Sequence, residues 1–86
     1  MQPSSNERSY EMEGTVVFFD DARGYGWIRR DDGQMPDVYV HFTHIKGMPG
    51  HRQLFLGWRV RFELGDVGRG PMALNVHVTD LEREAV

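Results

Sequence analysis

Cysteine is absent from this chain of 86 residues. Its absence excludes disulfides, thiolate metal sites, iron–sulfur clusters and a cysteine nucleophile, and it is typical of proteins from a reducing compartment. Long apolar runs are also missing, because no stretch approaches the roughly 18 residues that a membrane-spanning helix needs. The first residues, 1–8, lack the apolar stretch of a secretory signal. We therefore expect one small cytoplasmic domain without a membrane partner.

Helical periodicity is absent as well, because apolar residues nowhere recur every three to four positions for the length of a helix. Short apolar runs between turn residues predict five strands instead, at 15–19, 25–30, 37–42, 58–64 and 72–79. The Asp-Gly pair within 31–33 favours a tight hairpin between the second and third strands. A single helical turn, in 43–47 or 80–85, is the most helix that the sequence predicts.

Five short strands leave sheet edges that closure into a barrel protects best. The long connection after the third strand, residues 43–57, favours the partly open Greek-key barrel of the OB type. The sequence therefore predicts an all-β, five-stranded antiparallel barrel over residues 13–79. Residues 1–12 are expected to form a polar, acidic tail before it, and residues 80–86 an acidic tail after it.

Negative charge is concentrated at the two ends of the chain. The formal net charge is −3, and residues 1–13 and 80–86 each carry −2. Residues 14–79 hold eight basic against seven acidic side chains, and Lys46 is the only lysine among the ten basic residues of the whole chain. Arginine favours planar, bidentate contacts with phosphates, so the overall acidity does not exclude a nucleic-acid partner.

Aromatic side chains are predicted to gather on one side of the second and third strands. Alternation places Tyr25 and Trp27 together on one strand, and Tyr39 and His41 together on the next, with Phe42 at the end. The small or branched residues of the same strands then face the barrel interior: Gly26, Ile28, Val38 and Val40. Flat rings flanked by cations match what single-stranded nucleic acid needs, and the flanking cations are Arg23, Arg29 and Arg30.

Two segments resemble the ribonucleoprotein motifs of bacterial cold-shock proteins: 23–28 resembles the first motif and 38–42 the second. Segments 14–19, 31–33 and 70–76 resemble other parts of the same family. The resemblance implies a barrel that binds single-stranded DNA or RNA, preferring pyrimidines, and acts as an RNA chaperone or a regulator of transcription or translation. It implies stacking by Phe18, Tyr25, Trp27, Tyr39, His41, Phe42 and His51. The polar contacts that it implies come from Arg23, Asp37 and Arg69.

Some positions depart from the family pattern. The family usually has Lys-Trp-Phe-Asn where this chain has Val-Phe-Phe-Asp at 17–20, and often a Phe where this chain has His51. The connection that contains His51 is also one residue longer. One phosphate-facing cation is thereby lost, the Trp ring is replaced by the smaller ring of Phe18, and an amide becomes a carboxylate at Asp20. We expect weaker binding or an altered base preference.

Neighbouring or isolated aromatics leave structural alternatives open. Phe18 and Phe19 are adjacent, so one of them must face inward, and Phe19 is the expected one. Trp58 alternates with apolar residues of its strand and is expected in the core. The outward rings of Tyr25, Trp27 and Tyr39 are also compatible with cross-strand pairs that only stabilise the sheet.

Other functional classes receive less support. The histidines 41, 44, 51 and 77 lack the spacing of a zinc site, and the paired aspartates at 20–21 and 31–32 are typical of turns. We expect no metal, cofactor, small-molecule substrate or catalytic residue, and a monomer. The alternative to nucleic-acid binding is a barrel that grips a proline-rich peptide on the same rings.

Overall fold

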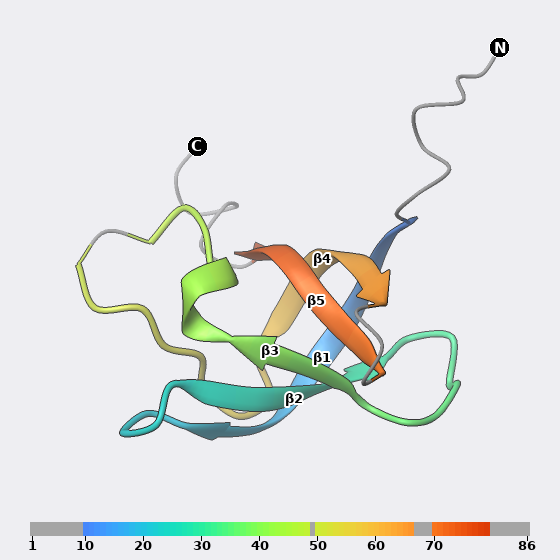
Figure 1. Cartoon of the computed structure of the whole chain (residues 1–86), viewed down its shortest axis with the longest axis horizontal. Helices are drawn as coiled ribbons and strands as arrows, with labels where there is room; N and C mark the ends of the chain where they lie inside the picture. Colours follow the sequence, from blue (N-terminus) through green and yellow to red (C-terminus); the bar gives the residue numbers. More distant parts are fainter. Residues whose placement is uncertain (1–9, 49, 67–69, 80–86) are drawn as a thin grey trace, which may run out of the picture.

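The computed structural model describes residues 10–48, 50–66 and 70–79 and folds them into five strands (Figure 1). The strands are β1 (Tyr10–Asp20), β2 (Tyr25–Arg30), β3 (Val38–His41), β4 (Arg59–Asp66) and β5 (Pro71–Val78). One turn of 3-10 helix, η2 (Phe42–His44), follows β3. The all-β prediction is confirmed, and the helical turn lies at the first of the two expected places, whereas the second lies outside the described residues. No helix in the described ranges has the length and apolar character needed to cross a membrane.

The strands close into a barrel in the order β1-β2-β3-β5-β4. Four neighbouring pairs are antiparallel, as predicted, but β3 and β5 are parallel. The reason is the long connection after β3, which carries the chain to β4 on the far side of β5 (Figure 1). β5 then lies between β4 and β3 and runs parallel to β3. Every strand thereby has two neighbours, and the junction between β3 and β5 is the shortest, with Tyr39 paired to Met72 and Ile45 bridged to Val76 just beyond β3.

β1 begins earlier than its apolar pattern predicts. It starts at Tyr10, and residues 10–15 pair with β4. Exposed acidic side chains interrupt the apolar pattern here, and Glu11 accepts a hydrogen bond of 2.7 Å from Nη1 of Arg61. The first strand therefore includes residues 10–12, which the sequence placed in the tail. The rest of that tail, and the tail 80–86, lie outside the described residues.

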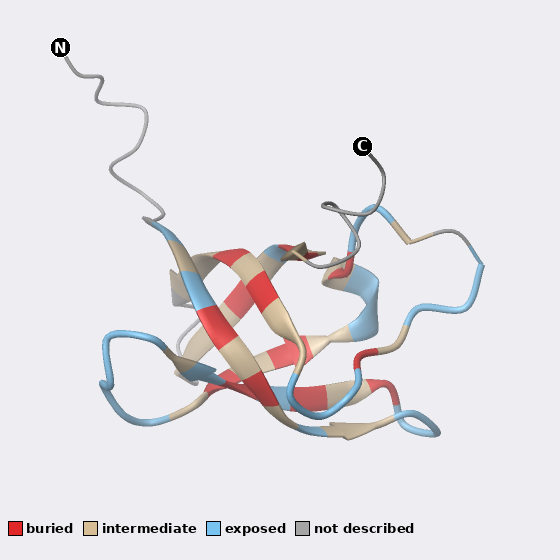
Figure 2. Ribbon diagram, turned by 180° about the vertical axis from the view of Figure 1, so that it is seen from behind, coloured by how far each residue is buried: buried red, intermediate tan, exposed pale blue. Residues whose placement is uncertain are grey.

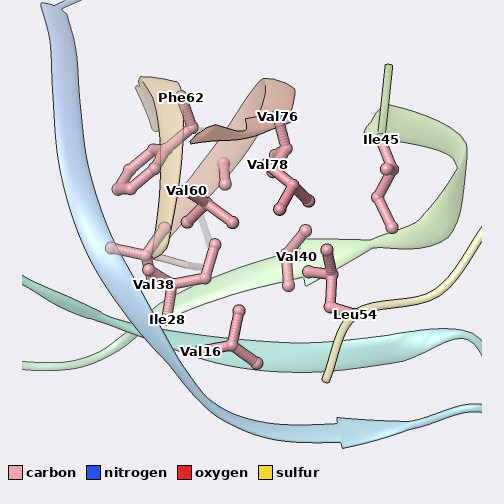
Figure 3. Packing of buried hydrophobic residues seen from close by; sticks show 11 residues of the cluster. Val16, Ile28, Val38, Val40, Ile45, Leu54, Val60, Phe62, Val76 and Val78 are labelled. Atoms are coloured by element: carbon pink, nitrogen blue, oxygen red, sulfur yellow. The ribbon is translucent and has the colours of Figure 1, made fainter. Parts of the chain in front are cut away.

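The core consists of eleven buried apolar side chains from all five strands, the segment after η2 and the long connection (Figure 3). They are Val16, Ile28, Val38, Val40, Ile45, Leu54, Val60, Phe62, Ala73, Val76 and Val78. Along β2 and β3, buried and more exposed residues alternate, as expected of strands with one face toward the core (Figure 2). Trp58, which was expected in the core, packs against its margin and meets the ring of Phe55 at a centroid distance of 4.7 Å.

The connection between β2 and β3 begins with the predicted turn but is longer than a tight hairpin. The amide of Gly33 donates to the carbonyl of Arg30 at 3.1 Å, and β3 begins only at Val38. Two arginines hold the carboxylates of this turn. Arg59 of β4 donates to both carboxylate oxygens of Asp31, at 2.7 and 2.5 Å. Arg30 donates to Asp32 at 3.0 and 2.7 Å, so the turn is tied to the barrel on both sides.

These arginines make the stability of the fold depend on pH. Hydrogen bonds from Arg59 lower the pKa of Asp31 below its ordinary value of 3.8, and those from Arg30 and the amide of Gln34 lower the pKa of Asp32. A carboxyl whose pKa is lower in the folded state stabilises the fold above its unfolded pKa, and this contribution disappears as the pH falls through the folded pKa. We expect the midpoint of urea unfolding to drop between about pH 6 and about pH 2.5.

The variant Asp31→Asn is the control for this dependence. It keeps an oxygen that accepts from Arg59 but has no carboxyl to titrate. The drop in the unfolding midpoint over the same pH interval should be smaller in this variant. An equal drop in both proteins would show that other groups control acid unfolding.

Candidate nucleic-acid interface

The pairing of β2 with β3 brings the predicted rings together on one side of the sheet. Trp27 lies opposite Tyr39, and Tyr25 lies opposite His41. From β1, Phe18 pairs with Trp27. The structure therefore assembles rings from three strands and from η2, although they are up to 24 positions apart in the sequence. We call this surface the aromatic face and define it by Phe18, Tyr25, Trp27, Tyr39, His41 and Phe42.

Four rings of the aromatic face, those of Phe18, Tyr25, Tyr39 and Trp27, contact one another in a series. Phe18 and Tyr25 have centroids 5.9 Å apart, and Tyr25 and Tyr39 lie 6.0 Å apart with planes only 23° from parallel. Trp27 meets Tyr39 edge-on at 5.7 Å. Phe18 and Trp27 remain exposed by 41% and 38%, respectively, which is unusual for side chains of this size. Ring faces therefore stay available to a flat ligand.

Phe18 faces outward because β1 contains an irregularity just before it. The register of β1 against β2 shifts between Val16 and Phe18, so that Val17 is the extra residue. Val16 is buried, and Phe19 packs against the core from a half-buried position. The prediction that Phe19 faces inward and Phe18 outward agrees with this arrangement. Without the shift, Val16 and Phe18 would point to the same side of the strand.

One end of the aromatic face is formed by His41 and Phe42, whose ring centroids are 4.8 Å apart. Nδ1 of His41 lies 2.9 Å from Oγ1 of Thr43, which orients the imidazole at the start of η2. Phe42 is 40% exposed, and its ring lies against Gly24, where a Cβ atom would come within 2.6 Å of Cδ1 of Phe42. Within the described residues, no three histidine or acidic side chains are grouped as metal ligands.

A hollow of about 460 Å³ lies beside Phe42, between the β1–β2 turn and the long connection. Its walls include Arg23 from the turn and His51 and Arg52 from the connection. His51 is thus brought next to Phe42, but its Nε2 is also 2.6 Å from Oδ1 of Asp21. The hollow therefore brings the ring of Phe42 together with the cationic side chains of Arg23 and Arg52.

A larger groove, of about 660 Å³, lies at the other end of the aromatic face. Trp27 and Tyr39 form one wall, Asp37 lies beside them, and Pro71 and Met72 of β5 form the opposite wall. The carboxylate of Asp37 is therefore placed where it could accept hydrogen bonds from the edge of a base that stacks on these rings.

Met72 is a lining residue that sequence reasoning missed. The alternation along 72–79 predicted that the large apolar residues at even positions share one face. Asn75 has a positive φ of 50°, and the register of β4 against β5 shifts near it, so Ala73 and Val76 both face the core. Met72 is thereby turned outward, beside Tyr39, with which it pairs. An asparagine, which tolerates positive φ, was the one local signal of this change.

The predicted cations divide into three groups. Arg23 and Arg29 are exposed beside the aromatic face, and each lies near a carboxylate: Arg23 near Asp20 at 3.8 Å, and Arg29 near Asp37 at 3.5 Å. Arg30 is on the opposite side of β2, where it binds Asp32, so the structure does not bring it to this face. Strand alternation gives the reason, since adjacent residues point to opposite sides. Arg69 lies outside the described residues.

Gly26 lets β1 and β2 approach closely under the rings. A Cβ atom at this position would overlap the carbonyl oxygen of Phe18 and lie 2.7 Å from Cδ1 of Phe19. Because a backbone oxygen in a paired strand cannot move aside, we expect Gly26→Ala to destabilise the fold by about 1–3 kcal/mol. Urea unfolding measures this effect. Unchanged stability would show that β1 and β2 are less closely packed than described here.

Comparison with known proteins gives a consistent result. The sequence matches the family described as the 'cold-shock' DNA-binding domain over residues 12–79. Cold shock-like protein CspC of Bacillus cereus is 43% identical over 65 residues, which cover 76% of this chain and 95% of the relative. A cold shock-like protein of Aquifex aeolicus is 45% identical over 67 residues, covering 78% and 93%. For cold shock-like protein CspC of Escherichia coli K12, the identity is 41% over 66 residues, covering 77% and 93%.

The matched range includes all five strands except the first two residues of β1, and thus every ring of the aromatic face. The resemblance inferred from the two motifs is confirmed. The family consists of nucleic-acid-binding domains rather than enzymes, in agreement with the prediction that the chain is not an enzyme. The chain therefore belongs to the cold-shock DNA-binding domain family.

Proposed function

We propose that this protein binds single-stranded RNA or DNA by stacking successive bases on the aromatic face. The observation that carries the proposal is the series of contacting rings from β1, β2 and β3, which leaves Phe18 and Trp27 about 40% exposed, together with the equally exposed ring of Phe42 in η2. Every base has a flat face, and stacking on an aromatic side chain contributes about 1–3 kcal/mol per base. A duplex buries these base faces and offers only its edges and its backbone.

Polar groups around the rings complete the proposed interface. In this proposal, Arg23 and Arg29 meet phosphates, and Asp37 meets a base edge in the large groove, and the support is the position of these side chains beside the aromatic face. His51 lines the hollow beside Phe42 and would contact a further nucleotide. Arg69 keeps the contact role that the family resemblance implies. We leave Arg30 out of the interface because it binds Asp32 on the opposite side of β2.

The proposed cellular role follows from this mode of binding. Bases held on the rings cannot pair with other bases, so the protein would keep RNA single-stranded, as an RNA chaperone or a regulator of transcription or translation does. We include in the proposal a preference for pyrimidine-rich strands, which the family resemblance implies, and action as a monomer in the cytoplasm during stress.

Titration of tryptophan fluorescence with oligo-dT tests the proposed function. Trp27 is 38% exposed on the aromatic face, whereas Trp58 packs at the core margin against Phe55. We expect partial quenching, because only Trp27 stacks on a base. The variant Trp27→Phe keeps a ring for binding but should lose most of the quenching.

A proline-rich peptide titrated in parallel separates the two binding classes. Quenching by oligo-dT, with no response to the peptide, supports the proposal. A response to the peptide alone would identify the aromatic face as a protein-binding surface. No response to either ligand would contradict both assignments.

A further inference from the structure

The β1–β2 turn places two adjacent carboxylates among the cations at one end of the aromatic face. Asp20 is the last residue of β1, and its Oδ1 accepts a hydrogen bond of 3.1 Å from the amide of Arg23. Its Oδ2 lies 3.8 Å from Nε of the same arginine. The guanidinium of Arg23 is largely exposed, so water and phosphates reach it, but it already has an anionic neighbour.

Asp21 has a similar relation to the long connection. Its Oδ1 lies 2.6 Å from Nε2 of His51, a residue 30 positions later in the chain. Both side chains line the hollow beside Phe42, together with Arg23 and Arg52. A carboxylate is therefore built into the place where a phosphate of a bound strand would enter. Arg29 and Asp37 repeat the arrangement at the other end of the face, at 3.5 Å.

A phosphate that approaches these cations has to replace a carboxylate or share its partner. This competition weakens the phosphate contacts and leaves base stacking unaffected. A duplex depends on phosphate contacts, since its base faces are covered, and it carries one charge per roughly 1.7 Å. A single strand obtains most of its binding energy from the rings. The competition therefore lowers the affinity for a duplex more than the affinity for a single strand.

We infer that Asp20 and Asp21 are specificity-determining residues that make this protein discriminate against duplex nucleic acid, by placing negative charge beside Arg23 and on the imidazole of His51, which phosphates would otherwise contact. The inference rests on the proposed single-strand binding and adds to it the residues that exclude the competing ligand. The two carboxylates lower total affinity, and the protein gains selectivity for unpaired bases in return.

The double variant Asp20→Asn/Asp21→Asn tests the inference. Asparagine keeps the Oδ1 atoms that accept from the amide of Arg23 and contact His51, so only charge is removed. Binding of oligo-dT and of a duplex is measured by anisotropy over a range of salt concentrations. Exposed ion pairs are weak, so freeing each cation should change affinity by at most about fivefold. We expect duplex affinity at low salt to rise about tenfold, and oligo-dT affinity by about threefold.

Salt dependence gives a second readout. Each additional phosphate contact steepens the plot of log affinity against log salt by about 0.9 for a duplex and about 0.7 for a single strand. The double variant should therefore show a duplex slope steeper by roughly 1–2 than the unmodified protein. A purely structural role of the two carboxylates would leave this slope unchanged.

Two controls separate local from general charge effects. Glu11→Gln/Glu13→Gln removes the same number of negative charges, two, on the β1–β4 side of the barrel, where Glu11 pairs with Arg61 and Glu13 with Arg59. This variant should leave the ratio of duplex to oligo-dT affinity unchanged. Arg23→Ala should reduce duplex affinity more in the Asp20→Asn background than in the unmodified protein, because only there is the guanidinium available to a phosphate.

The outcomes distinguish the two proposals. If the unmodified protein binds oligo-dT but the double variant keeps the same affinity ratio and duplex slope, the inference is overturned and the proposed function stands. A change of the ratio equal to that of Glu11→Gln/Glu13→Gln would also overturn it, because general charge would then explain the effect. If the unmodified protein does not bind oligo-dT, the proposed function itself fails.

Discussion

The double variant Tyr25→Ala/Tyr39→Ala is expected to lose measurable binding to single-stranded oligonucleotides while it still folds. The two rings lie at the centre of the aromatic face, with centroids 6.0 Å apart and nearly parallel planes. Each stacked base contributes about 1–3 kcal/mol, so the loss of both rings should weaken binding by roughly 2–6 kcal/mol. Fluorescence anisotropy with labelled oligo-dT measures the loss.

The same variant should be somewhat less stable than the unmodified protein. Both tyrosines are half-buried, and their mutual ring contact contributes about 0.5–1.5 kcal/mol to stability. The single variants provide a test at lower structural risk, since each removes one ring. Phe55→Ala is the matched control, because Phe55 is 50% exposed but lies outside the aromatic face. Undiminished binding in the folded double variant would contradict the stacking mechanism.

Phe62→Ala and Phe18→Ala should have opposite effects on stability and binding, although both remove the same side chain. Phe62 is 1% exposed and is the largest fully buried side chain in the core. Its truncation should reduce the free energy of unfolding by about 3–5 kcal/mol. Because small domains are stable by only about 5–15 kcal/mol in total, a substantial part of the fold's stability would be lost.

Phe18→Ala removes a ring that is 41% exposed. We expect this variant to lose about 1–3 kcal/mol of oligonucleotide binding, because one base loses its stacking partner. Its unfolding midpoint in urea should stay close to that of the unmodified protein. If Phe18→Ala instead unfolds the protein and Phe62→Ala does not, the assignment of Phe62 to the core and of Phe18 to the surface is wrong.

Strand positions and most of the aromatic face were predictable from local sequence. Side chains alternate along a strand, so the local sequence suffices to place Tyr25 and Trp27 on one side of β2 and Gly26 and Ile28 on the other side. The two motifs then identified the family. The change of phase at Val17 was not foreseen, although the sides of Phe18 and Phe19 were predicted correctly. Prediction failed near Asn75, where the alternation along β5 changes phase, because an extra residue in a strand depends on the pairing with its partner strand. Met72 was missed for this reason.

The early start of β1 was not predictable either. Residues 10–15 look polar, and they form a strand because β4 pairs with them and its arginines bind Glu11 and Glu13. Those partners follow almost 50 positions later in the chain. Local strand propensity carries no information about such a distant partner. The sequence of a polar segment that pairs with a distant strand therefore looks like that of an unstructured tail.

The sequence by itself determined the class of fold, the sides of β2 and β3 and the chemistry of the aromatic face, because these depend on residues a few positions apart. Only the tertiary structure decided which charges meet. In the folded barrel, Arg30 binds Asp32 away from the aromatic face, Asp21 contacts His51, and Asp31 forms an ion pair with Arg59. Ion pairs depend on distances of a few ångströms between side chains from different strands and loops. Barrel closure sets those distances, and the order of residues along the chain does not reveal them.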